Sequence, residues 1–363
     1  MDSNIVSLVH ALGILQGLVL GIILLFTNKK YKSTLFLGLF LIGFAIEFLP
    51  ILLHDLKILE HNPGLILIPI NFTWIIFPLF FIYVQKISIF SNERITYRVL
   101  YPGAISILFQ FLLYFLPDAA KEFLRNSHIF DAYFILGLLY SAYIVYRINL
   151  YIKNHIDEVK NQFASVKNRQ LQWVRFFAAF CLALVAVRIG TLFIDATPFL
   201  HLFISSINLI FVFSIAIVGI IQYNVISVAN KSTSPEKENI LKKEISNNKI
   251  LELINRIDDY VIDSEIFTKL DLSVVDIASA LGEHPRDISL AINTHYNKNF
   301  NTYINEFRVN KAKKLLKENV LGNLSVEGLS KEVGFHSKAS FYTAFKKSTG
   351  TTPKNYIDRF LIS

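Results

Sequence analysis

Seven long apolar runs in the first two thirds of the chain constrain its fold more than any other feature. They lie at residues 6–26, 34–53, 65–84, 99–116, 129–146, 174–194 and 199–221. A helix needs about 20 apolar residues to cross a lipid bilayer, and each run approaches that length. Polar and charged residues crowd the chain after about Tyr223. The sequence therefore predicts an all-α protein, with a seven-transmembrane-helix bundle at residues 1–226 and a cytoplasmic domain after it.

Basic residues are concentrated in the first, third and fifth loops between these runs. They are Lys29, Lys30 and Lys32, then Lys86, Arg94 and Arg98, then Arg147, Lys153, Lys160, Lys167, Arg169 and Arg175. The other loops hold only Lys57, Lys121 and Arg125. Loops rich in Lys and Arg stay in the cytoplasm. We therefore expect the N-terminus outside and the C-terminus inside the cytoplasmic (inner) membrane of a bacterium. No cleavable signal peptide is expected, since no basic segment precedes the first run.

Two charged residues interrupt the apolar runs at similar depth. Glu47 lies about two-thirds of the way out along the second run, and Arg188 lies at a comparable level in the sixth. A lone charge at such depth costs at least ~2.5–3.5 kcal/mol on insertion scales. We expect both residues to face the interior of the bundle, either as a structural ion pair or as part of a ligand pocket that opens outward.

The outer side of the bundle carries several groups that can bind metals, but in no metal-site pattern. They are His10, His54, His61, Asp195 and His201. Their spacing matches no ligand motif, so we expect no metal and no cofactor. The single cysteine, Cys181, permits no internal disulfide. The net charge of +8 suits both anionic lipid and nucleic acid and does not choose between them.

Two connecting segments have more than one interpretation. The basic, partly amphipathic residues 148–172 form either a solvated extension of the flanking helices or a surface that contacts anionic lipid or the cytoplasmic domain. Residues 227–262 are predicted to be a linker with a helical part at 240–261. There Ile250, Ile254, Ile257 and Val261 repeat at a/d spacing. This stripe indicates packing against the cytoplasmic domain, with a short dimeric coiled coil as the alternative.

Residues 324–353 predict two short helices joined by a tight turn. The first helix is expected at 326–333 with Ser325 as its N-cap, and Gly334 supplies the permissive backbone after it. The second is expected at 337–349, with Phe341 and Phe345 on one face. This is the helix-turn-helix pattern, whose second helix enters the major groove of DNA. An ordinary helical hairpin is the alternative interpretation.

The same pattern occurs earlier in the chain at a fixed offset of 52 residues. Residues 272–282 parallel residues 324–334, so Gly282 takes the place of Gly334. Its second helix is expected at 285–295. A longer helix at 301–318 is expected to join the two copies. We therefore predict two recognition helices side by side on successive turns of one face of DNA.

Residues from about 272 to 356 resemble the two-motif DNA-binding domain of the AraC/XylS family of transcription regulators. The matching residues are Leu272-Ser273, Ile277-Ala278, Leu281-Gly282, Ile288-Ser289, Ile292-Asn293, Phe300, Tyr303-Ile304-Asn305, Arg308-Val309, Ala312, Leu315-Leu316, Val333-Gly334-Phe335, Ser337, Phe341, Phe345-Lys346-Lys347, Gly350, Thr352-Pro353 and Tyr356. The resemblance implies a bacterial regulator whose effector domain precedes this unit. The DNA-binding domain is accordingly placed at residues 263–363.

The resemblance also implies which residues face DNA. They are Arg286, Ser289, Leu290 and Asn293 in the first recognition helix, and Lys338, Ala339, Ser340, Tyr342 and Thr343 in the second. Arg286 suits guanine or phosphate, and Asn293 suits base edges. Leu290 stands where a polar or basic residue is usual, and Thr343 stands where Arg is common.

These observations predict a membrane-bound, one-component transcription regulator. A signal or small-molecule ligand would bind the bundle in the lipid bilayer, and movement of the seventh run would pass through residues 226–261 to the DNA-binding domain. Double-stranded promoter DNA is the expected partner, and a homodimer would strengthen binding. The alternatives are a transporter with a regulatory DNA-binding tail and, because of Leu290 and Thr343, a helix-turn-helix interaction module without DNA specificity. An enzyme is not expected, since the sequence has no phosphate loop, Ser/His/Asp set, or kinase or cyclase block.

Overall fold

The computed structural model consists of helices joined by turns and loops. It describes residues 3–27, 33–62, 65, 67–91, 93–125, 127–166, 169–190, part of 203–219, 247–318 and 325–361. These residues contain no β-strand, and an isolated bridge between Phe163 and Ser273 is their β pairing. The chain divides into two compact units, Met1–Lys153 with Leu171–Val228, and Asn154–Gln170 with Ala229–Ser363. Residues 154–170 thus belong to the C-terminal unit, although residues 154–162 are the end of a helix that begins in the first unit.

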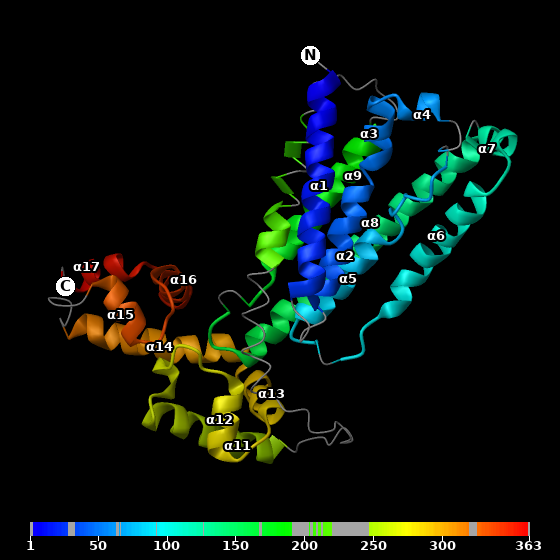
Figure 1. Ribbon diagram of the computed structural model, residues 1–363. Helices are drawn as coiled ribbons and strands as arrows, with labels where there is room; N and C mark the ends of the chain where they lie inside the picture. Colours follow the sequence, from blue (N-terminus) through cyan, green and yellow to red (C-terminus); the bar gives the residue numbers. More distant parts are fainter. Residues whose placement is uncertain are drawn as a thin grey trace. The chain divides into compact units, whose positions relative to one another are not determined.

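The first unit contains the apolar helices of the N-terminal part. They are α1 (Ser3–Thr27), α2 (Ser33–Ile46), α3 (Leu49–Asp55), α4 (Ile58–His61), α5 (Ile76–Ile87), η2 (Tyr97–Leu100), α6 (Tyr101–Tyr114), α7 (Asp118–Arg125), α8 (His128–Gln162) and α9 (Gln172–Gly190) (Figure 1). Three helical stretches of the described residues are long and apolar enough to cross a membrane. They are Ile5–Phe26, Thr34–His54 and Ala132–Gln162.

The expectation of seven complete spans is therefore corrected to three within the described residues. Among the described residues of the run at 65–84, the α-helix begins only at Ile76, because Pro69 offers no backbone N–H and side chains bond the backbone before α5. One such bond runs from Asn71 N to Gln110 Oε1 at 3.0 Å. In the run at 99–116 the α-helix is only 14 residues long. The sixth run corresponds to α9 over most of its length. Most side chains in the second half of that helix lie outside the described residues, as does much of the seventh run.

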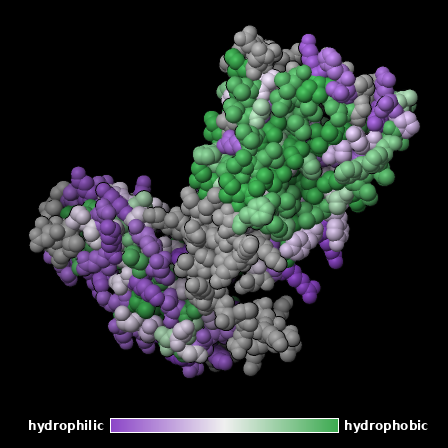
Figure 2. Space-filling view, in the orientation of Figure 1, coloured by the Kyte–Doolittle hydropathy of each residue, from purple (hydrophilic) through white to green (hydrophobic). Residues whose placement is uncertain are grey.

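Glycines allow α1 and α2 to approach closely. A Cβ atom placed on Gly38 would lie 2.7 Å from the carbonyl oxygen of Gly21, so the two backbones are in direct contact there. Small residues at such crossings are typical of helix pairs in membranes. The opposite side of α1 exposes Leu8, Leu12 and Leu15, and Figure 2 shows apolar residues over most of the visible surface of this unit. A surface of this kind suits contact with lipid.

The second unit contains the polar, C-terminal helices. They are α11 (Asn247–Asp263), η4 (Ile266–Thr268), α12 (Val274–Leu281), α13 (Pro285–Tyr296), α14 (Phe300–Lys317), α15 (Val326–Glu332), α16 (Lys338–Thr349) and α17 (Pro353–Leu361). The four helices predicted at 285–295, 301–318, 326–333 and 337–349 are present as α13, α14, α15 and α16, with ends within one residue of the prediction. The first copy of the pattern also begins with a helix, α12.

Two hydrophobic clusters form the core of this unit, and α14 contributes to both. Phe300, Tyr303 and Ile304 from its first half lie in the cluster with α11, α12 and α13. Val309 and Ala312, further along α14, lie in the cluster with α15 and α16. The stripe of α11 predicted from sequence is buried in the first cluster, which confirms that this helix packs against the C-terminal unit.

Candidate nucleic-acid interface

The first helix pair, α12 and α13, is held by a capping box and a left-handed glycine. Ser273 caps α12, and the carboxylate of Asp276 accepts hydrogen bonds from the backbone N–H of Ser273 at 2.7 Å and from its hydroxyl at 2.8 Å. Burial alone would raise the pKa of Asp276, but hydrogen bonds from Lys269 and Ser273, with the charge of Lys269, outweigh it and hold the pKa below its usual value. Gly282 ends α12 at φ +70°, a conformation that glycine adopts readily.

The second helix pair, α15 and α16, uses the same plan with different chemistry. Ser325 caps α15 and accepts from the backbone N–H of Gly328 at 3.1 Å. Glycine therefore stands where the first copy has Asp276, so no side chain completes the capping box. Ser337 caps α16 and accepts from the backbone N–H of Ser340 at 3.3 Å. The predicted N-cap at Ser325 is confirmed, whereas Ser337, predicted as the first residue of the second helix, is its N-cap.

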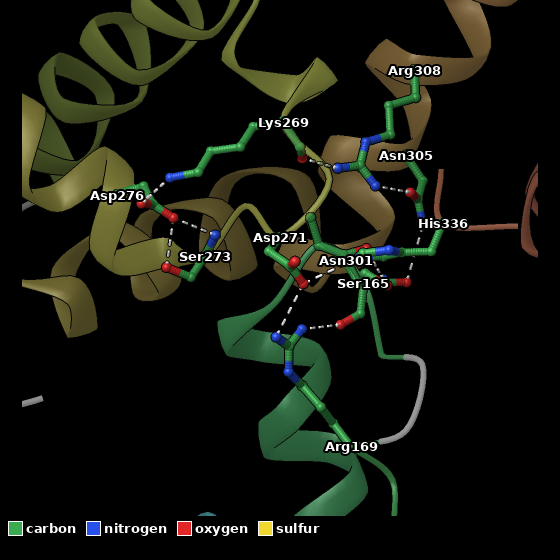
Figure 3. A network of polar contacts seen from close by, with 11 residues as sticks. Ser165, Arg169, Lys269, Asp271, Ser273, Asp276, Asn301, Asn305, Arg308 and His336 are labelled. Carbon is green, nitrogen blue, oxygen red and sulfur yellow. Dashed lines mark hydrogen bonds and ion pairs between the residues drawn. The ribbon is translucent and has the colours of Figure 1, made fainter. Parts of the chain in front are cut away.

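Arg308, in the middle of α14, connects η4 to the turn of the second pair. Its side chain is buried, with 1% of its surface exposed. The guanidinium donates to the backbone carbonyls of Phe267 at 2.6 Å and Lys269 at 2.8 Å, and it lies 5.4 Å from the ring centre of Phe335 (Figure 3). Burial lowers the pKa of Arg308 to about 10, although the charge of Asp271 opposes this, and the group stays protonated at neutral pH. One side chain thus connects η4, α14 and the turn of the second pair.

The turn of the second pair is also in contact with η4. Gly334 has φ +94°, and a Cβ atom there would lie 2.7 Å from the carbonyl oxygen of Phe267 and 2.8 Å from that of Thr268. Both atoms belong to the backbone, so neither can move aside easily. Gly334 is therefore required for space as well as for conformation. At Gly282, by contrast, nothing lies within 4 Å of the added atom.

The first recognition helix, α13, presents the predicted residues to different degrees. Arg286 is exposed and Leu290 is 41% exposed, whereas Ser289 and Asn293 are half-buried. The hydroxyl of Ser289 donates to the backbone carbonyl of Asn161 at 3.1 Å. The side chain predicted to meet DNA here is therefore engaged by another part of the same unit.

The second recognition helix, α16, presents Lys338, Ala339 and Thr343 on its exposed surface, and Ser340 and Tyr342 half-buried. The ammonium of Lys338 lies 5.6 Å from the ring centre of Tyr342, which holds the two side chains together. The hydroxyl of Thr343 donates to the carbonyl of Ala339 at 2.9 Å. The hydrogen bonds and ring contacts described for these five residues lie within α16 or its cap.

Exposed lysines lie on the helices beside the recognition helices. Lys314 on α14, Lys346 and Lys347 on α16 and Lys354 on α17 are exposed. Lys311 is less suitable for phosphate contacts, because it lies 2.6 Å from a carboxylate oxygen of Glu265. The exposed lysines can neutralise phosphates, which makes DNA binding depend on salt.

Residues 277–359 match the family model of a helix-turn-helix domain. The matched residues run from within α12 into α17 and so contain both recognition helices. The match supports a DNA-binding regulator of the AraC type. No curated protein and no solved structure matches the chain.

Sequence reasoning missed several residues that hold the helix-turn-helix domain together. Arg308 was included only as part of the resemblance, yet its place four residues after Ile304 and four before Ala312 sets it on the buried face of α14. Asp258 on α11 accepts a hydrogen bond from Tyr303 at 2.5 Å and another from Tyr296. Burial, together with the hydrogen bond to Asp258 and its negative charge, raises the pKa of Tyr296 to about 12. In the sequence, the signal for Arg308 is a single charged residue on the otherwise apolar face of α14.

The predicted pair of Glu47 and Arg188 stays a prediction, because the structure describes the side chain of Glu47 only. The carboxylate of Glu47 accepts hydrogen bonds from the backbone N–H of Phe72 and from the hydroxyl of Thr73, the latter at 3.3 Å. The side chain of Arg188 lies outside the described residues, as do Asp195 and His201. Among the described residues, no group of three or more His, Cys, Asp or Glu side chains is placed to hold a metal ion.

Proposed function

We propose that this chain is a membrane-anchored transcription regulator that binds double-stranded promoter DNA sequence-specifically through its two helix-turn-helix motifs. The N-terminal helices would anchor it in the inner membrane of a bacterium and receive a signal or ligand. The function is recognition and not catalysis. Two copies would bind together, because paired half-sites strengthen binding.

The observation that carries this proposal is the pair of recognition helices attached to one shared helix. The cores on the two halves of α14 attach α13 to its first half and α16 to its second half. Two recognition helices held by one continuous helix keep a fixed spacing, as two motifs that bind one DNA duplex require. The family match over residues 277–359 supports the same function.

The membrane part of the proposal is supported by the three candidate spans and by residues 154–170. These residues belong to the same compact unit as the helix-turn-helix domain, so both must lie on one side of a membrane. The positive charge of the loop that contains them favours the cytoplasmic side. Both arguments support a DNA-binding domain on the cytoplasmic side, where DNA is found in a bacterium.

A polar cluster around Glu47 is the proposed place for the signal to act. Besides the bonds from Phe72 and Thr73 to Glu47, Gln110 donates to the carbonyl of Asn71 at 2.8 Å and to the hydroxyl of Tyr133 at 3.2 Å. Such groups between apolar helices are commonly functional. Glu47→Ala should change reporter expression in cells but leave the affinity of the purified chain for non-specific DNA unchanged. If expression stays at the wild-type level, the signal acts elsewhere.

The main test measures DNA binding by the full chain in lipid nanodiscs. A duplex from upstream of its own coding sequence is compared with the same bases in shuffled order. We expect tighter binding to the natural sequence, and a logarithm of affinity that falls by about 0.9 for each phosphate contact per tenfold rise in salt. Equal affinity for the two duplexes would show that the protein binds DNA only non-specifically. Absence of binding at low salt would overturn the proposal.

A further inference from the structure

Residues 154–170 lie against the first helix-turn-helix motif through contacts that are mostly made by backbone atoms. The backbone N–H of Ala164 donates to the carbonyl of Leu272 at 2.9 Å, and the side-chain amide of Asn301 donates to the carbonyl of Ala164 at 2.5 Å. Ala164 is buried in the same hydrophobic cluster as α12, α13 and α14. Phe163 forms an isolated antiparallel bridge with Ser273, the N-cap of α12. The segment is therefore seated on this motif.

The segment reaches the recognition helix itself. The carbonyl of Asn161, at the end of α8, accepts a hydrogen bond from the hydroxyl of Ser289. Ser289 is one of the four residues of α13 expected to face DNA, and Asn293 lies one helical turn further along the same face. A DNA backbone near Ser289 would have to occupy the space that the end of α8 fills. Contact with DNA and contact with the segment therefore exclude each other at this point.

The segment also touches the second motif through one carboxylate. An oxygen of Asp271 accepts from the guanidinium of Arg169 at 3.2 Å, and the imidazole Nε2 of His336 lies 3.1 Å from the same oxygen (Figure 3). Arg169 also donates to the carbonyl of Ser165 and lies over the ring of Phe163 at 4.4 Å. His336 belongs to the turn of the second motif. One residue of the segment is thus connected through Asp271 to both motifs.

The segment is a direct continuation of a candidate membrane span. The helix α8 extends over 35 residues from His128 to Gln162, which corresponds to about 52 Å, against ~30 Å for the hydrocarbon core of a bilayer. Its residues up to Lys153 belong to the first unit, and those from Asn154 onward belong to the second. A shift or rotation of α8 is carried along a continuous helix to Asn161.

We propose that residues 154–170 compete with DNA for the first recognition helix, so that a displacement of α8 regulates DNA binding. This proposal rests on the proposed function. It assigns transmission of the signal to the end of α8 and the loop after it, whereas the sequence predicted transmission through residues 226–261. With the segment seated, α13 is covered at Ser289 and the chain binds DNA weakly. When the segment leaves, both recognition helices are available.

A reversible disulfide between residues 163 and 273 tests this competition. Phe163→Cys and Ser273→Cys are combined with Cys181→Ala, and the full chain is placed in lipid nanodiscs. Residues directly opposite each other in an antiparallel bridge lie close enough for a disulfide to form with small adjustment. Affinity for a short mixed-sequence duplex is measured at low salt, so no operator need be known. We expect the oxidised protein to bind at least about tenfold more weakly than the same protein after reduction.

The reduced protein is the control for loss of the Ser273 cap, and each single-cysteine variant is the control for oxidation itself. Equal affinity of the oxidised and reduced forms would overturn the competition but leave DNA binding intact. Tighter binding by the oxidised form would make the segment part of the DNA interface and overturn it too. If the two cysteines do not cross-link, the segment is not seated on α12 and the proposal fails. Absence of binding by both forms and by the wild type would instead overturn the proposed function.

Discussion

The two helix-turn-helix motifs are built from one sequence pattern but differ in their surroundings. The first motif has a carboxylate in its cap, a core that includes α11 and Ala164, and a recognition helix in contact with the end of α8. The second has glycine in place of that carboxylate, a smaller core, and a turn pressed against η4. The pattern sets the shape of each motif, whereas its neighbours decide how stable and how accessible it is.

The difference also suggests a division of labour between the motifs. The first is held by α11, through the bonds of Asp258 with Tyr296 and Tyr303 and an ion pair of Arg256 with Glu283 at 2.6 Å. It is also the motif that residues 154–170 contact. The second depends on the joint with Arg308 and Gly334. The first motif is therefore the one positioned for regulation.

The largest expected effect is the difference in stability loss between substitutions at the two turn glycines, Gly334 and Gly282. Gly334→Ala should destabilise the C-terminal unit by about 2–5 kcal/mol, from roughly 1–2 for the left-handed backbone and roughly 1–3 for the clash with backbone oxygens. Gly282→Ala meets no neighbour and should lose only about 1–2 kcal/mol. Hydrogen exchange of the amides of α15 and α16 in the full chain measures the first, and those of α12 and α13 measure the second. Equal losses would show that the contact with η4 is unimportant.

The next effect is the difference in stability loss between substitutions at Arg308 and Arg256, which both donate to backbone carbonyls. Arg308→Met leaves the carbonyl oxygens of Phe267 and Lys269 without their donor and should cost about 2–4 kcal/mol, at roughly 1–2 kcal/mol for each lost hydrogen bond. Arg256→Met removes a half-exposed side chain and an ion pair worth under about 1 kcal/mol. Denaturant unfolding of the full chain, followed by hydrogen exchange in the C-terminal unit, compares the two. A larger loss for Arg256→Met would contradict the role given to Arg308.

Acid should loosen the first motif before the second. The pKa of Asp276 is depressed in the folded chain, so its contribution is present above the ordinary aspartate value and is lost as pH falls through the folded pKa, below about pH 4. A helix cap of this kind is worth about 1 kcal/mol. The cap of α15 has Gly328 at the equivalent place and nothing to protonate. Hydrogen exchange between neutral pH and pH 3 should show this order in the wild type, and Asp276→Asn should flatten the response of α12.

The smallest effect concerns the contact between Arg169 and Asp271. Arg169→Ala should raise the affinity of the full chain for DNA about two- to fivefold, since a partly exposed ion pair is worth under about 1 kcal/mol. Lys160→Ala is the matched control, because that lysine pairs with Asp157 within α8 at 3.4 Å. Titration of labelled DNA against both variants in nanodiscs decides the matter. An increase of the same size in Lys160→Ala would reflect lost charge and not release of the segment.

Local features of the domain could be predicted well because short-range physics governs them. The serine cap at 325, the glycines at 282 and 334, and the apolar spacing along α14 define helix ends and inner faces from within a few residues. The third apolar run shows the limit of such reasoning. Its first half has suitable hydropathy for a span, but Gln110, 39 residues after Asn71, bonds the backbone at Asn71 that a helix would have used. Hydropathy does not reveal such a partner.

The sequence by itself determined that the chain has an apolar and a polar part, that the polar part contains one pattern twice, and which helices follow from it. Only the tertiary structure decided that Arg308 connects η4 to the turn of the second motif and that residues 154–170 lie on the first motif. The second result depends on contacts such as that between Asn161 and Ser289, 128 residues apart. Asn161 and Ala164 take part through backbone atoms, which every residue carries, so no side-chain pattern marks them in the sequence.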